Sequence, residues 1–398
     1  MENIKVDVVV VGAGPGGSTA AWELAKRKVN VLVLEKRQEI GAPKRCAEGV
    51  GDDLLDKFHL TKDRRWAAQE IKGSILYSPS MRRIEVEGRN RGRVVERKVF
   101  EKFLAAEAIN AGAKYMVKTT VTDVIKEDGK IVGVKAEHMG EKFEVHARLV
   151  IAADGVDSMT GKRAGIETTN RLTDYHSGFQ YEMAGVNARE DMIHLFFGNK
   201  IAPKGYVWIF PKGNTLANVG IGIVGVKSGE DGRARDYLDR FIKDNQGIFG
   251  KASPVEINGG GIPVSASCKT SVGEGIMVIG DAAQQVNPIH GGGIGLAMNA
   301  GRIAAEVGAA ALSEGDTSRK RLLEYERRWD EEEGGRLKKL LKLRHFLEKM
   351  EDDDFERFAD ILDAETILKL GSGELKPFLS VLLTKAPKML PLAKKFLY

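Results

Sequence analysis

The N-terminal end of the chain carries the feature that most constrains its fold, a glycine-rich turn between an apolar strand and a helix. Residues Val6 to Ala25 read VDVVVVGAGPGGSTAAWELA, so the apolar run breaks at Gly12 and a helix follows Gly17. Gly12 permits a tight turn, Gly14 lets the backbone approach a pyrophosphate, and Gly17 lets the helix pack on the strand. The helix N-terminus then points its free N–H groups at the phosphates. The turn expected to bind a dinucleotide comprises Gly12, Gly14, Pro15, Gly16 and Gly17.

A second apolar strand with an acid at its end strengthens this interpretation. Residues Asn30 to Leu34 form the expected strand, and Glu35 follows at about the 20-residue offset of a carboxylate that binds ribose hydroxyls. A lone GxGxxG motif would be weak evidence. Strand, glycines and acid together predict a βαβ unit that binds a dinucleotide, whereas the alternative is a glycine-rich turn in another kind of βαβ unit.

A second glycine-rich segment far downstream points to the identity of the dinucleotide. Residues Gly280 to Leu296 read GDAAQQVNPIHGGGIGL. A strand that ends at Gly280 would let the Asp281 carboxylate hydrogen-bond a ribityl hydroxyl. Residues 291–293 would place a helix N-terminus where negative charge develops on a reduced flavin ring. These features predict FAD, and the alternative is an ordinary strand-turn-helix connection. The residues expected on the flavin side are Asp281, Gly292, Gly293 and Ile294.

The order of strands and helices indicates a discontinuous α/β domain with an inserted sheet. Strands and helices alternate in the first part of the chain, as in α/β proteins, whereas short β-rich runs such as IHLFFG and ANVGIGIV predict an antiparallel sheet. Periodic Leu, Phe and Ile positions near the C-terminus predict amphipathic helices. The expected units are a Rossmann-type FAD-binding domain (1–73, 98–176 and 263–312), a substrate-binding sheet domain (74–97 and 177–262) and a C-terminal helical region (313–398).

Composition narrows the class of protein. The 398 residues exceed what one hydrophobic core usually supports, and a net charge of +5 from nearly balanced acids and bases argues against nucleic-acid binding. Only Cys46 and Cys268 occur, which gives neither a disulfide framework nor a cluster of metal ligands. No apolar run reaches the roughly 18 residues of a spanning helix, and the first strand begins too early for a signal peptide. We expect a cytoplasmic protein without a metal.

Three aromatic residues alternate along one expected strand of the inserted sheet. In the segment PKGYVWIFP, residues Pro203 to Pro211, the side chains of Tyr206, Trp208 and Phe210 share one face. This follows because successive strand residues point to opposite faces. The three rings would form a flat apolar wall that suits a hydrocarbon ligand. The alternative is that they belong to the core of the sheet.

These motifs together resemble a flavoprotein superfamily that includes aromatic hydroxylases, halogenases and geranylgeranyl reductases. A third motif, VIAADGVDS from Val150 to Ser158, completes the order of the cofactor segments. The segment GAPKRCAEGV, Gly41 to Val50, resembles the flavin-side loop of the geranylgeranyl reductases, and the aromatic strand fits their PxxYxWxFP pattern. The resemblance covers essentially the whole chain and is strongest to the archaeal reductases of digeranylgeranyl glycerophospholipids. The halogenase pattern WxWxIP is not matched.

The resemblance implies the aromatic-hydroxylase fold with an inserted substrate sheet, and it assigns roles by position. Glu35 would bind the adenosine ribose, Val121 would meet adenine through its backbone, and Arg97 would lie near the cofactor. The aromatic strand would contact a prenyl chain. The residues implied along the flavin are Arg45, Cys46, Ala47, Gly49, Asp281, Gly293 and Ile294.

By this resemblance the activity is the saturation of isolated carbon-carbon double bonds in geranylgeranyl chains of archaeal-type glycerophospholipids. Isolated alkenes accept hydride poorly, so the bond must be placed over the reduced flavin and protonated. The acid could be Cys46, Tyr206 or bound water. The alternatives are a flavin-dependent monooxygenase of the same fold and a lipid-binding protein that keeps FAD without turnover.

The sequence leaves the electron donor open. No second strand with a GxGxxG turn and an acid occurs, so the chain lacks a dedicated nicotinamide domain. Electrons would come from a ferredoxin-like carrier or from reduced nicotinamide that docks transiently.

The sequence allows two interpretations for each of three further residues, Cys46, His290 and Lys338. Arg45 would favour the thiolate of Cys46, although Cys46 could equally be a packing residue. His290 could place substrate, but a loop histidine with an ordinary hydrogen bond is the better interpretation. Lys338 lies on a basic helix that could bind a lipid phosphate or touch a membrane, or could simply be a solvated face. The basic residues of this helix are Arg336, Lys338, Lys339, Lys342 and Arg344.

Overall fold

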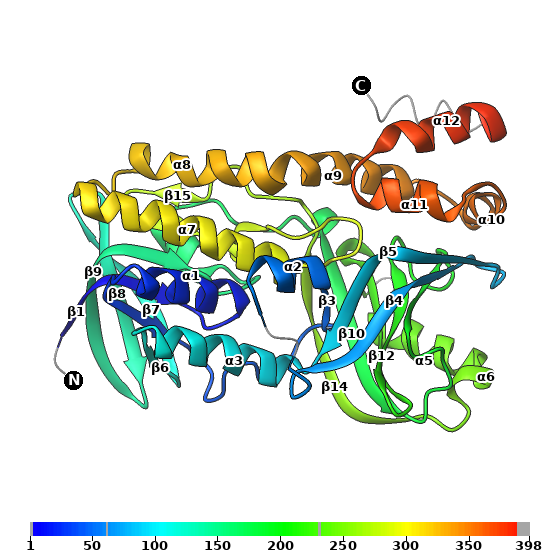
Figure 1. The fold of residues 1–398 in the computed structure, drawn as a ribbon, viewed down its shortest axis with the longest axis horizontal. Coiled ribbons are helices and arrows are strands. Elements are labelled where there is room, and N and C mark those ends of the chain that lie inside the picture. The colour runs from blue at the N-terminus through cyan, green and yellow to red at the C-terminus, as the bar shows by residue number, and fades with distance from the viewer. Residues whose placement is uncertain (1–2, 61–62, 230–231, 388–398) are drawn as a thin grey trace.

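The computed structural model describes residues 3–60, 63–229 and 232–387, which form two eight-stranded sheets and the helices that cover them. The two sheets lie at opposite ends of an elongated molecule, and a row of helices runs along one side of both (Figure 1). This α/β architecture with a separate antiparallel sheet confirms the predicted fold class.

The first sheet has a parallel centre. β1 (Ile4–Val11) pairs in parallel with β2 (Val31–Leu34) on one side and with β9 (Glu141–Ala152) on the other. Residues 8–10 are fully buried, since both faces of this part of the sheet are covered, and this explains the uninterrupted apolar run. The other strands are β6 (Lys114–Met116), β7 (Thr119–Glu127), β8 (Lys130–His138), β15 (Val272–Gly273) and β16 (Ile276–Val278).

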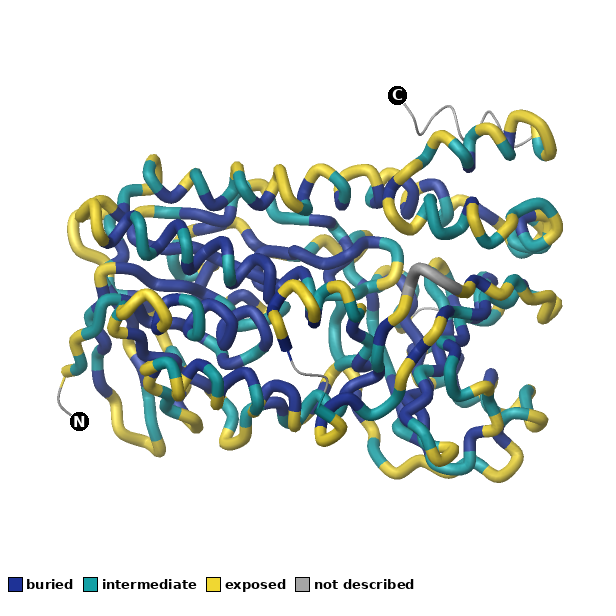
Figure 2. The backbone as a smooth tube through the Cα atoms, viewed as in Figure 1, coloured by how far each residue is buried: buried dark blue, intermediate teal, exposed yellow. Residues whose placement is uncertain are grey.

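Two helices pack closely on each other beside this sheet. α1 (Pro15–Lys26) begins within the glycine turn, earlier than the start predicted after Gly17, and α7 (Ile294–Glu314) follows the glycines of the second segment. A Cβ at Gly301 of α7 would lie 2.3 Å from the carbonyl oxygen of Gly16, so this crossing requires glycine. Figure 2 shows that both helices are among the most buried parts of the chain. α3 (Arg97–Asn110) also packs on α1.

The second sheet is mainly antiparallel, in the order β14-β10-β13-β12-β11-β4-β5-β3. In β12 the side chains of Val207 and Ile209 are fully buried against α5 (Ala234–Asp244), so Tyr206, Trp208 and Phe210 face the other way. The strands are β3 (Gly49–Gly51), β4 (Ala67–Tyr77), β5 (Arg83–Val95), β10 (Tyr175–Ala184), β11 (Met192–Phe197), β12 (Tyr206–Gly213), β13 (Leu216–Val224) and β14 (Ser253–Pro263).

The largest difference between strand pairing and the expected domain division lies within residues 49–73. Residues 49–51 and 67–73 belong to the second sheet, although the sequence interpretation assigned all of 1–73 to the cofactor domain. The reason is a long-range pairing: β4 lies parallel to β11, so a strand from the first part of the chain completes the inserted sheet. The domain boundaries themselves stay a prediction.

The C-terminal part is helical, and its helices follow the expected amphipathic pattern. α8 (Arg319–Trp329) continues through a π-helical turn at Asp330–Gly334 into α9 (Gly335–Leu347), which runs from the first sheet towards the second (Figure 1). Of the helices in the described ranges, none is long and apolar enough to cross a bilayer. The remaining helices are α2 (Asp52–Lys57), α4 (Met159–Ala164), α6 (Gln246–Phe249), α10 (Asp352–Ile361), α11 (Ala364–Gly371) and α12 (Leu375–Lys385).

Candidate active site

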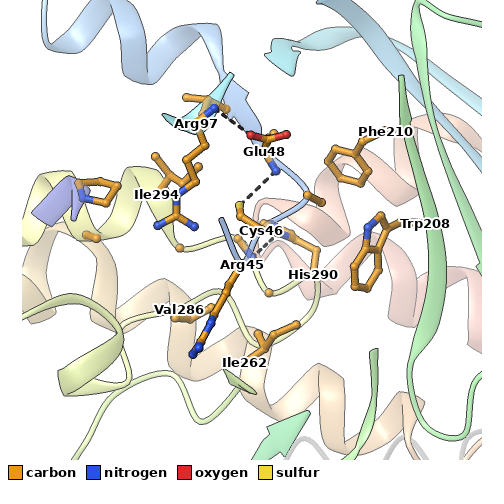
Figure 3. Close-up of a pocket in the computed structure, with 18 of the residues that line it drawn as sticks. Arg45, Cys46, Glu48, Arg97, Trp208, Phe210, Ile262, Val286, His290 and Ile294 are labelled. Atoms are coloured by element: carbon orange, nitrogen blue, oxygen red, sulfur yellow. Dashed lines mark hydrogen bonds between the residues drawn. The ribbon is translucent and has the colours of Figure 1, made fainter. Parts of the chain in front are cut away.

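One cavity of about 690 Å³ is lined by residues of both sheets (Figure 3). Its first end is formed by the glycine turn after β1 and by the segment after β16. Its opposite end is formed by β4, β11 and β12. The loop from Arg45 to Gly49 lines the cavity as well, and it leads directly into β3 of the second sheet.

The glycine turn has the geometry that its sequence predicts. Gly12 has a φ of +101°, and a Cβ there would lie 2.4 Å from the carbonyl oxygen of Ala153. A Cβ at Gly17 would lie 2.0 Å from the carbonyl oxygen of Gly12, so helix and strand touch at this point. Gly14, by contrast, has no atom within 4 Å of its Cβ position and lines the cavity beside Pro15. The turn therefore leaves open space for a phosphate where Gly14 was expected to provide it.

The motif that ends β9 braces this turn. Asp154 accepts a hydrogen bond of 2.8 Å from the backbone N–H of Thr160 at the start of α4. The Cα of Asp154 lies 3.3 Å from the Cβ position of Gly12. The acid thus holds the loop against which the first glycine packs.

Glu35 ties the end of β2 to the glycine turn. Its carboxylate accepts hydrogen bonds from the backbone N–H groups of Ala13 and Arg37, both at 2.9 Å. The backbone carbonyl of Val121 accepts a bond of 3.1 Å from Arg163. Neither Glu35 nor Val121 is among the described residues that line the cavity, so their contacts with the adenosine half of the cofactor stay predictions.

Asp281 presents a carboxylate to the cavity. It forms no hydrogen bond through its side chain within the described ranges, and a Cβ at Gly293 would lie 3.1 Å from its Oδ1. Burial raises the pKa of Asp281, and the nearby Arg97 guanidinium opposes this increase. A partly buried acceptor beside open space can take a donor from a ligand, and a ribityl hydroxyl is such a donor. Ile294 begins α7 here, so free helical N–H groups also face the site.

These observations fit FAD. The open glycine cradle suits a pyrophosphate, the unpaired Asp281 carboxylate suits the ribityl chain, and the N-terminus of α7 suits the electron-rich side of a flavin ring. The residues of the cradle and the carboxylate lie in one continuous cavity, as one extended cofactor requires.

Cys46 lies in the centre of the site, between Arg97 and the aromatic residues Trp208 and Phe210 (Figure 3). Its Sγ accepts a hydrogen bond of 3.1 Å from the backbone N–H of Glu48. Burial raises the pKa of the Cys46 thiol more than the Arg97 guanidinium lowers it, although part of the side chain faces the cavity. The site therefore favours the neutral thiol.

The expectation that Arg45 favours a Cys46 thiolate is wrong. The Arg45 side chain runs along Gly260 of β14, where a Cβ would lie 3.2 Å from the Arg45 Cδ, and it points away from Cys46 (Figure 3). The cation that acts on the thiol is Arg97. Sequence adjacency pointed to the wrong arginine because consecutive residues of an extended loop point in different directions.

The rest of this loop is held against the second sheet. The carbonyl of Ala47 accepts a bond of 3.1 Å from the side-chain amide of Asn218. A Cβ at Gly49 would lie 2.6 Å from the Phe210 ring, so a larger residue would displace the ring. Both residues line the cavity, as expected for residues near the flavin.

The aromatic strand forms one wall of the cavity. Tyr206, Trp208 and Phe210 all line it, and the rings of Tyr206 and Trp208 are 5.8 Å apart at 60°. The indole N–H of Trp208 donates to the side-chain oxygen of Gln180 at 2.8 Å, and Gly220 leaves room for the ring. The three rings therefore line a cavity, and the intervening residues form the core side of the strand. Contact of these rings with a substrate stays a prediction.

His290 contacts this wall through its backbone. Its carbonyl accepts a bond of 2.6 Å from the Tyr206 hydroxyl, and its Nδ1 accepts a bond of 3.1 Å from the backbone N–H of Gly292. Burial, helped by the Arg336 charge, lowers the pKa of His290 to about 4. His290 is an exposed residue that borders the cavity, and its Nδ1 lone pair is already engaged by the Gly292 N–H, which opposes protonation of Nδ1. His290 is therefore a neutral histidine at pH 7 with its proton on Nε2.

Lys338 lies away from the cavity. Its side chain is 61% exposed, and its ammonium pairs with Asp330 at 2.5 Å. The prediction that Arg344 belongs to an exposed basic face is wrong. Arg344 is only 4% exposed and donates a hydrogen bond to the carbonyl of Val264 at 2.8 Å. The alternation of leucine and basic residues hid this position, because a long side chain can cross the core and place its charge on buried carbonyls.

The sequence analysis did not predict a cluster of buried polar and charged side chains behind the cavity wall. Glu48 and Lys212 have fully buried side chains, and Lys44 is 3% exposed. Gln180 and Asn218 bond the loop of Cys46, and the amide nitrogen of Asn258 lines the cavity without a partner in the described chain. The sequence signal that could have indicated this cluster was Glu48, a charged residue between Cys46 and Gly49 in the expected flavin-side loop.

The fold and site define a dinucleotide-binding α/β protein whose second sheet lines the same cavity as the glycine turn. Residues 10–48 match the family model described as an NAD(P)-binding Rossmann-like domain. A flavin-dependent brominase has the same fold, with a TM-score of 0.75 and 20% identity over 92% of this chain and 94% of that chain. At that identity the likeness concerns the fold alone.

The chain belongs to the geranylgeranyl reductase family. Residues 174–262 match the model of the geranylgeranyl reductase catalytic domain. Digeranylgeranylglycerophospholipid reductase 2 of Methanopyrus kandleri is 41% identical over 98% of this chain and 99% of its own length. Digeranylgeranylglycerophospholipid reductase of Methanocaldococcus jannaschii is 42% identical over 99% of this chain and 99% of its own length. A geranylgeranyl bacteriochlorophyll reductase-like protein of Thermoplasma acidophilum has a TM-score of 0.91 and 36% identity over 98% of this chain and 100% of that chain.

Proposed function

We propose that the protein is an FAD-dependent reductase that saturates carbon-carbon double bonds in the geranylgeranyl chains of archaeal-type glycerophospholipids. The observation that carries the proposal is the single cavity that joins the glycine turn and Asp281 to the aromatic wall. Relatives named for this activity align with this chain over nearly the full length of both sequences, which supports the substrate class. They favour the reductase over a monooxygenase of the same fold.

The chain would bind FAD with the elements of the first sheet. The Gly12 to Gly17 turn would hold the pyrophosphate, Asp281 a ribityl hydroxyl, and the α7 N-terminus the flavin ring. Reduced FAD supplies the hydride for the reduction when it is bound.

The second sheet would orient the lipid. Tyr206, Trp208 and Phe210 offer ring faces to a prenyl chain, and Ile193 and Leu195 of β11 extend the apolar lining beyond them. Apolar walls exclude water from the double bond, which prevents competing reactions and strengthens the interaction of the few polar groups with the reacting atoms.

Cys46 is the better candidate for the proton donor. Its thiol is neutral, lines the cavity and lies near Arg97, so the thiolate left after proton transfer would be stabilised. The Tyr206 hydroxyl instead donates to the His290 carbonyl at 2.6 Å, and burial raises the pKa of Tyr206. Balance requires that the alkene gains one hydride and one proton, and that solvent then reprotonates the thiolate.

The partners of the enzyme follow from its chemistry. An external donor must reduce the cofactor, and a ferredoxin-like carrier and reduced nicotinamide both fit a chain with one glycine fingerprint. The lipid substrate implies that the protein contacts a membrane from the cytoplasmic side, with the exposed basic residues near Lys338 as the contact surface.

An anaerobic turnover experiment tests the proposed function. Chemically reduced protein is incubated with a geranylgeranyl glycerophospholipid, and the lipid is analysed by mass spectrometry. We expect added pairs of hydrogen atoms. Incorporation of oxygen in air would instead show a monooxygenase, and tightly held FAD without either product would show a binding protein.

A further inference from the structure

A buried ionic cluster lies directly behind the loop that carries Cys46. Glu48 and Lys212 have fully buried side chains, and their charged atoms are 2.9 Å apart. Lys44 bonds Glu182, and its Nζ lies 3.4 Å from Glu48. Burial of charges is costly, and replacing such a cluster with apolar residues often leaves a protein at least as stable. Stability alone therefore does not explain this cluster.

Every polar group of Glu48 has a partner. Its N–H donates to the Cys46 Sγ at 3.1 Å, and its carbonyl accepts from the N–H of Val95 at 2.9 Å. Its carboxylate accepts from the backbone N–H of Arg97 at 2.8 Å, from Asn218 at 2.7 Å and from Lys212 at 2.9 Å. Its φ is +73°, a conformation that residues other than glycine rarely adopt. The surroundings thus fix both the side chain and the strained backbone of Glu48.

These partners come from separate elements. Val95 and Arg97 lie at the junction of β5 and α3, whereas Lys212 and Asn218 lie on β12 and β13. Glu48 therefore joins the loop of Cys46 to the helix that supplies Arg97 and to the strand that supplies the aromatic wall.

A second set of bonds ties the same loop to the wall. Gln180 donates to the backbone carbonyl of Cys46 at 3.0 Å and accepts from the Trp208 indole at 2.8 Å. It also donates to Asn218 at 3.2 Å, which closes the network back to Glu48. The sulfur of Cys46 is held by Glu48 and its carbonyl by Gln180.

We propose that Glu48 is a positioning residue for the reduction: its carboxylate, held by Lys212 and Asn218, fixes the loop that points the Cys46 thiol into the cavity. This inference rests on the proposed function for its catalytic meaning, but not for the geometry of the thiol. Glu48 does not reach the substrate and acts through Cys46.

The charge of Glu48 also acts on the thiol. The groups that face Cys46 are Glu48 on its own loop, Arg97 on α3 and Tyr206 on β12. Asp281, after β16, faces Arg97 from the other side. Glu48 raises the pKa of the Cys46 thiol and Arg97 lowers it. Loss of the Glu48 charge leaves Arg97 less opposed, so the thiolate forms at lower pH.

The test compares the reaction of Cys46 with iodoacetamide in FAD-loaded wild-type protein and in Glu48→Gln. Peptide mass spectrometry separates Cys46 from Cys268. We expect Glu48→Gln to alkylate about tenfold faster at neutral pH, equivalent to a midpoint about one pH unit lower. Lipid turnover should fall at least as much while FAD stays bound. The control Glu96→Gln removes another carboxylate that pairs with Lys212, at 2.7 Å. Within the described chain this carboxylate forms no hydrogen bond to residues 45–49, so the alkylation profile of the control should match wild type.

The double variant Glu48→Gln with Lys212→Met separates positioning from support of the fold. It removes both charges of the buried pair, so it should recover the unfolding free energy that Glu48→Gln loses, while the altered alkylation profile persists. If Glu48→Gln does not fold, the alkylation of Cys46 can be measured in the double variant instead.

Two results would overturn the inference: a wild-type alkylation profile in both Glu48 variants, or the same change in Glu96→Gln. Wild-type protein that fails to reduce the lipid would contradict the proposed function and leave the alkylation result standing, so the two failures are distinguishable.

Discussion

Asp281 shows how one residue can set the strength of cofactor binding. Its carboxylate lies in a partly buried position with no hydrogen-bond partner among the described residues, while Arg97 and the α7 N-terminus hold positive charge nearby. A charged acceptor in such a place contributes most when a ligand hydroxyl completes its hydrogen bonds.

Replacement of Asp281 by alanine should weaken FAD binding. A hydrogen bond to a charged group contributes about 1.5–3 kcal/mol, so the Kd for FAD should rise at least about tenfold. Equilibrium dialysis of apoprotein with FAD measures this. Asp281→Asn keeps an acceptor oxygen and should lose less. Equal affinity of the alanine variant and wild type would refute the ribityl role.

His176 on β10 should make the protein sensitive to acid. Burial, helped by the Arg344 charge, lowers the pKa of His176 to about 4 from 6.5. The unfolded chain binds this proton more readily, so the free energy of unfolding falls as pH drops from 6.5 towards 4. In His176→Asn this fall should be shallower, though not abolished, because burial also lowers the pKa of His194 and His290.

Denaturant unfolding at a series of pH values measures this difference. The comparison uses the slope of the unfolding free energy against pH, so an overall change in stability does not affect it. Parallel curves for His176→Asn and wild type would contradict the assignment.

At the scale of elements, the side chains of β12 alternate between the core of the second sheet and the cavity. Val207 and Ile209 pack in the core with α5, and the alternate aromatic residues line the cavity. The period of two in the sequence made this division predictable, since side-chain direction in a strand depends only on local geometry.

Trp208→Ala should therefore impair lipid turnover more than cofactor binding. Loss of a buried aromatic contact costs about 2 kcal/mol or more, so kcat/KM for the lipid should fall about thirtyfold. FAD content should stay near wild type, because the ring belongs to the second sheet. Trp208→Phe keeps an aromatic face and serves as the control. Equal losses of lipid turnover and of bound FAD would show instead that Trp208 mainly supports the fold.

The contact of α7 with α1 gives a second prediction for an element. A Cβ at Gly301 would lie 2.3 Å from the Gly16 carbonyl oxygen, so Gly301→Ala must move α7 away from the glycine turn. Overpacking of this kind costs about 1–3 kcal/mol of unfolding free energy, and FAD should bind more weakly. Thermal unfolding with and without FAD measures both effects.

Gly371, at the end of α11, is the matched control. A Cβ there meets no atom within 4 Å, so Gly371→Ala should keep or raise stability. If both variants behaved alike, the close crossing of the two helices would not be the cause.

Some elements could not be predicted from local sequence. β4 joins the second sheet because it pairs with β11, more than a hundred residues later, and no local pattern records such a partner. The cluster around Glu48 was missed for the same reason, since Lys212 and Asn218 reach it only through the tertiary fold. The glycine turn and the aromatic strand were predictable because each is specified by its own residues.

At the scale of the whole molecule, the active site exists only where the two sheets meet. The first sheet supplies the glycine turn and Asp281, the second supplies the aromatic wall, and the loop of Cys46 crosses between them. We therefore expect the electrons of the cofactor and the double bond of the lipid to meet in this one cavity.

A single-turnover measurement tests that claim most directly. Protein with fully reduced FAD is mixed anaerobically with excess geranylgeranyl glycerophospholipid, and oxidised flavin and saturated double bonds are both counted. We expect one flavin to be oxidised for each double bond that is saturated. Flavin oxidation without hydrogen addition to the lipid, or a lipid that leaves the flavin reduced, would contradict it.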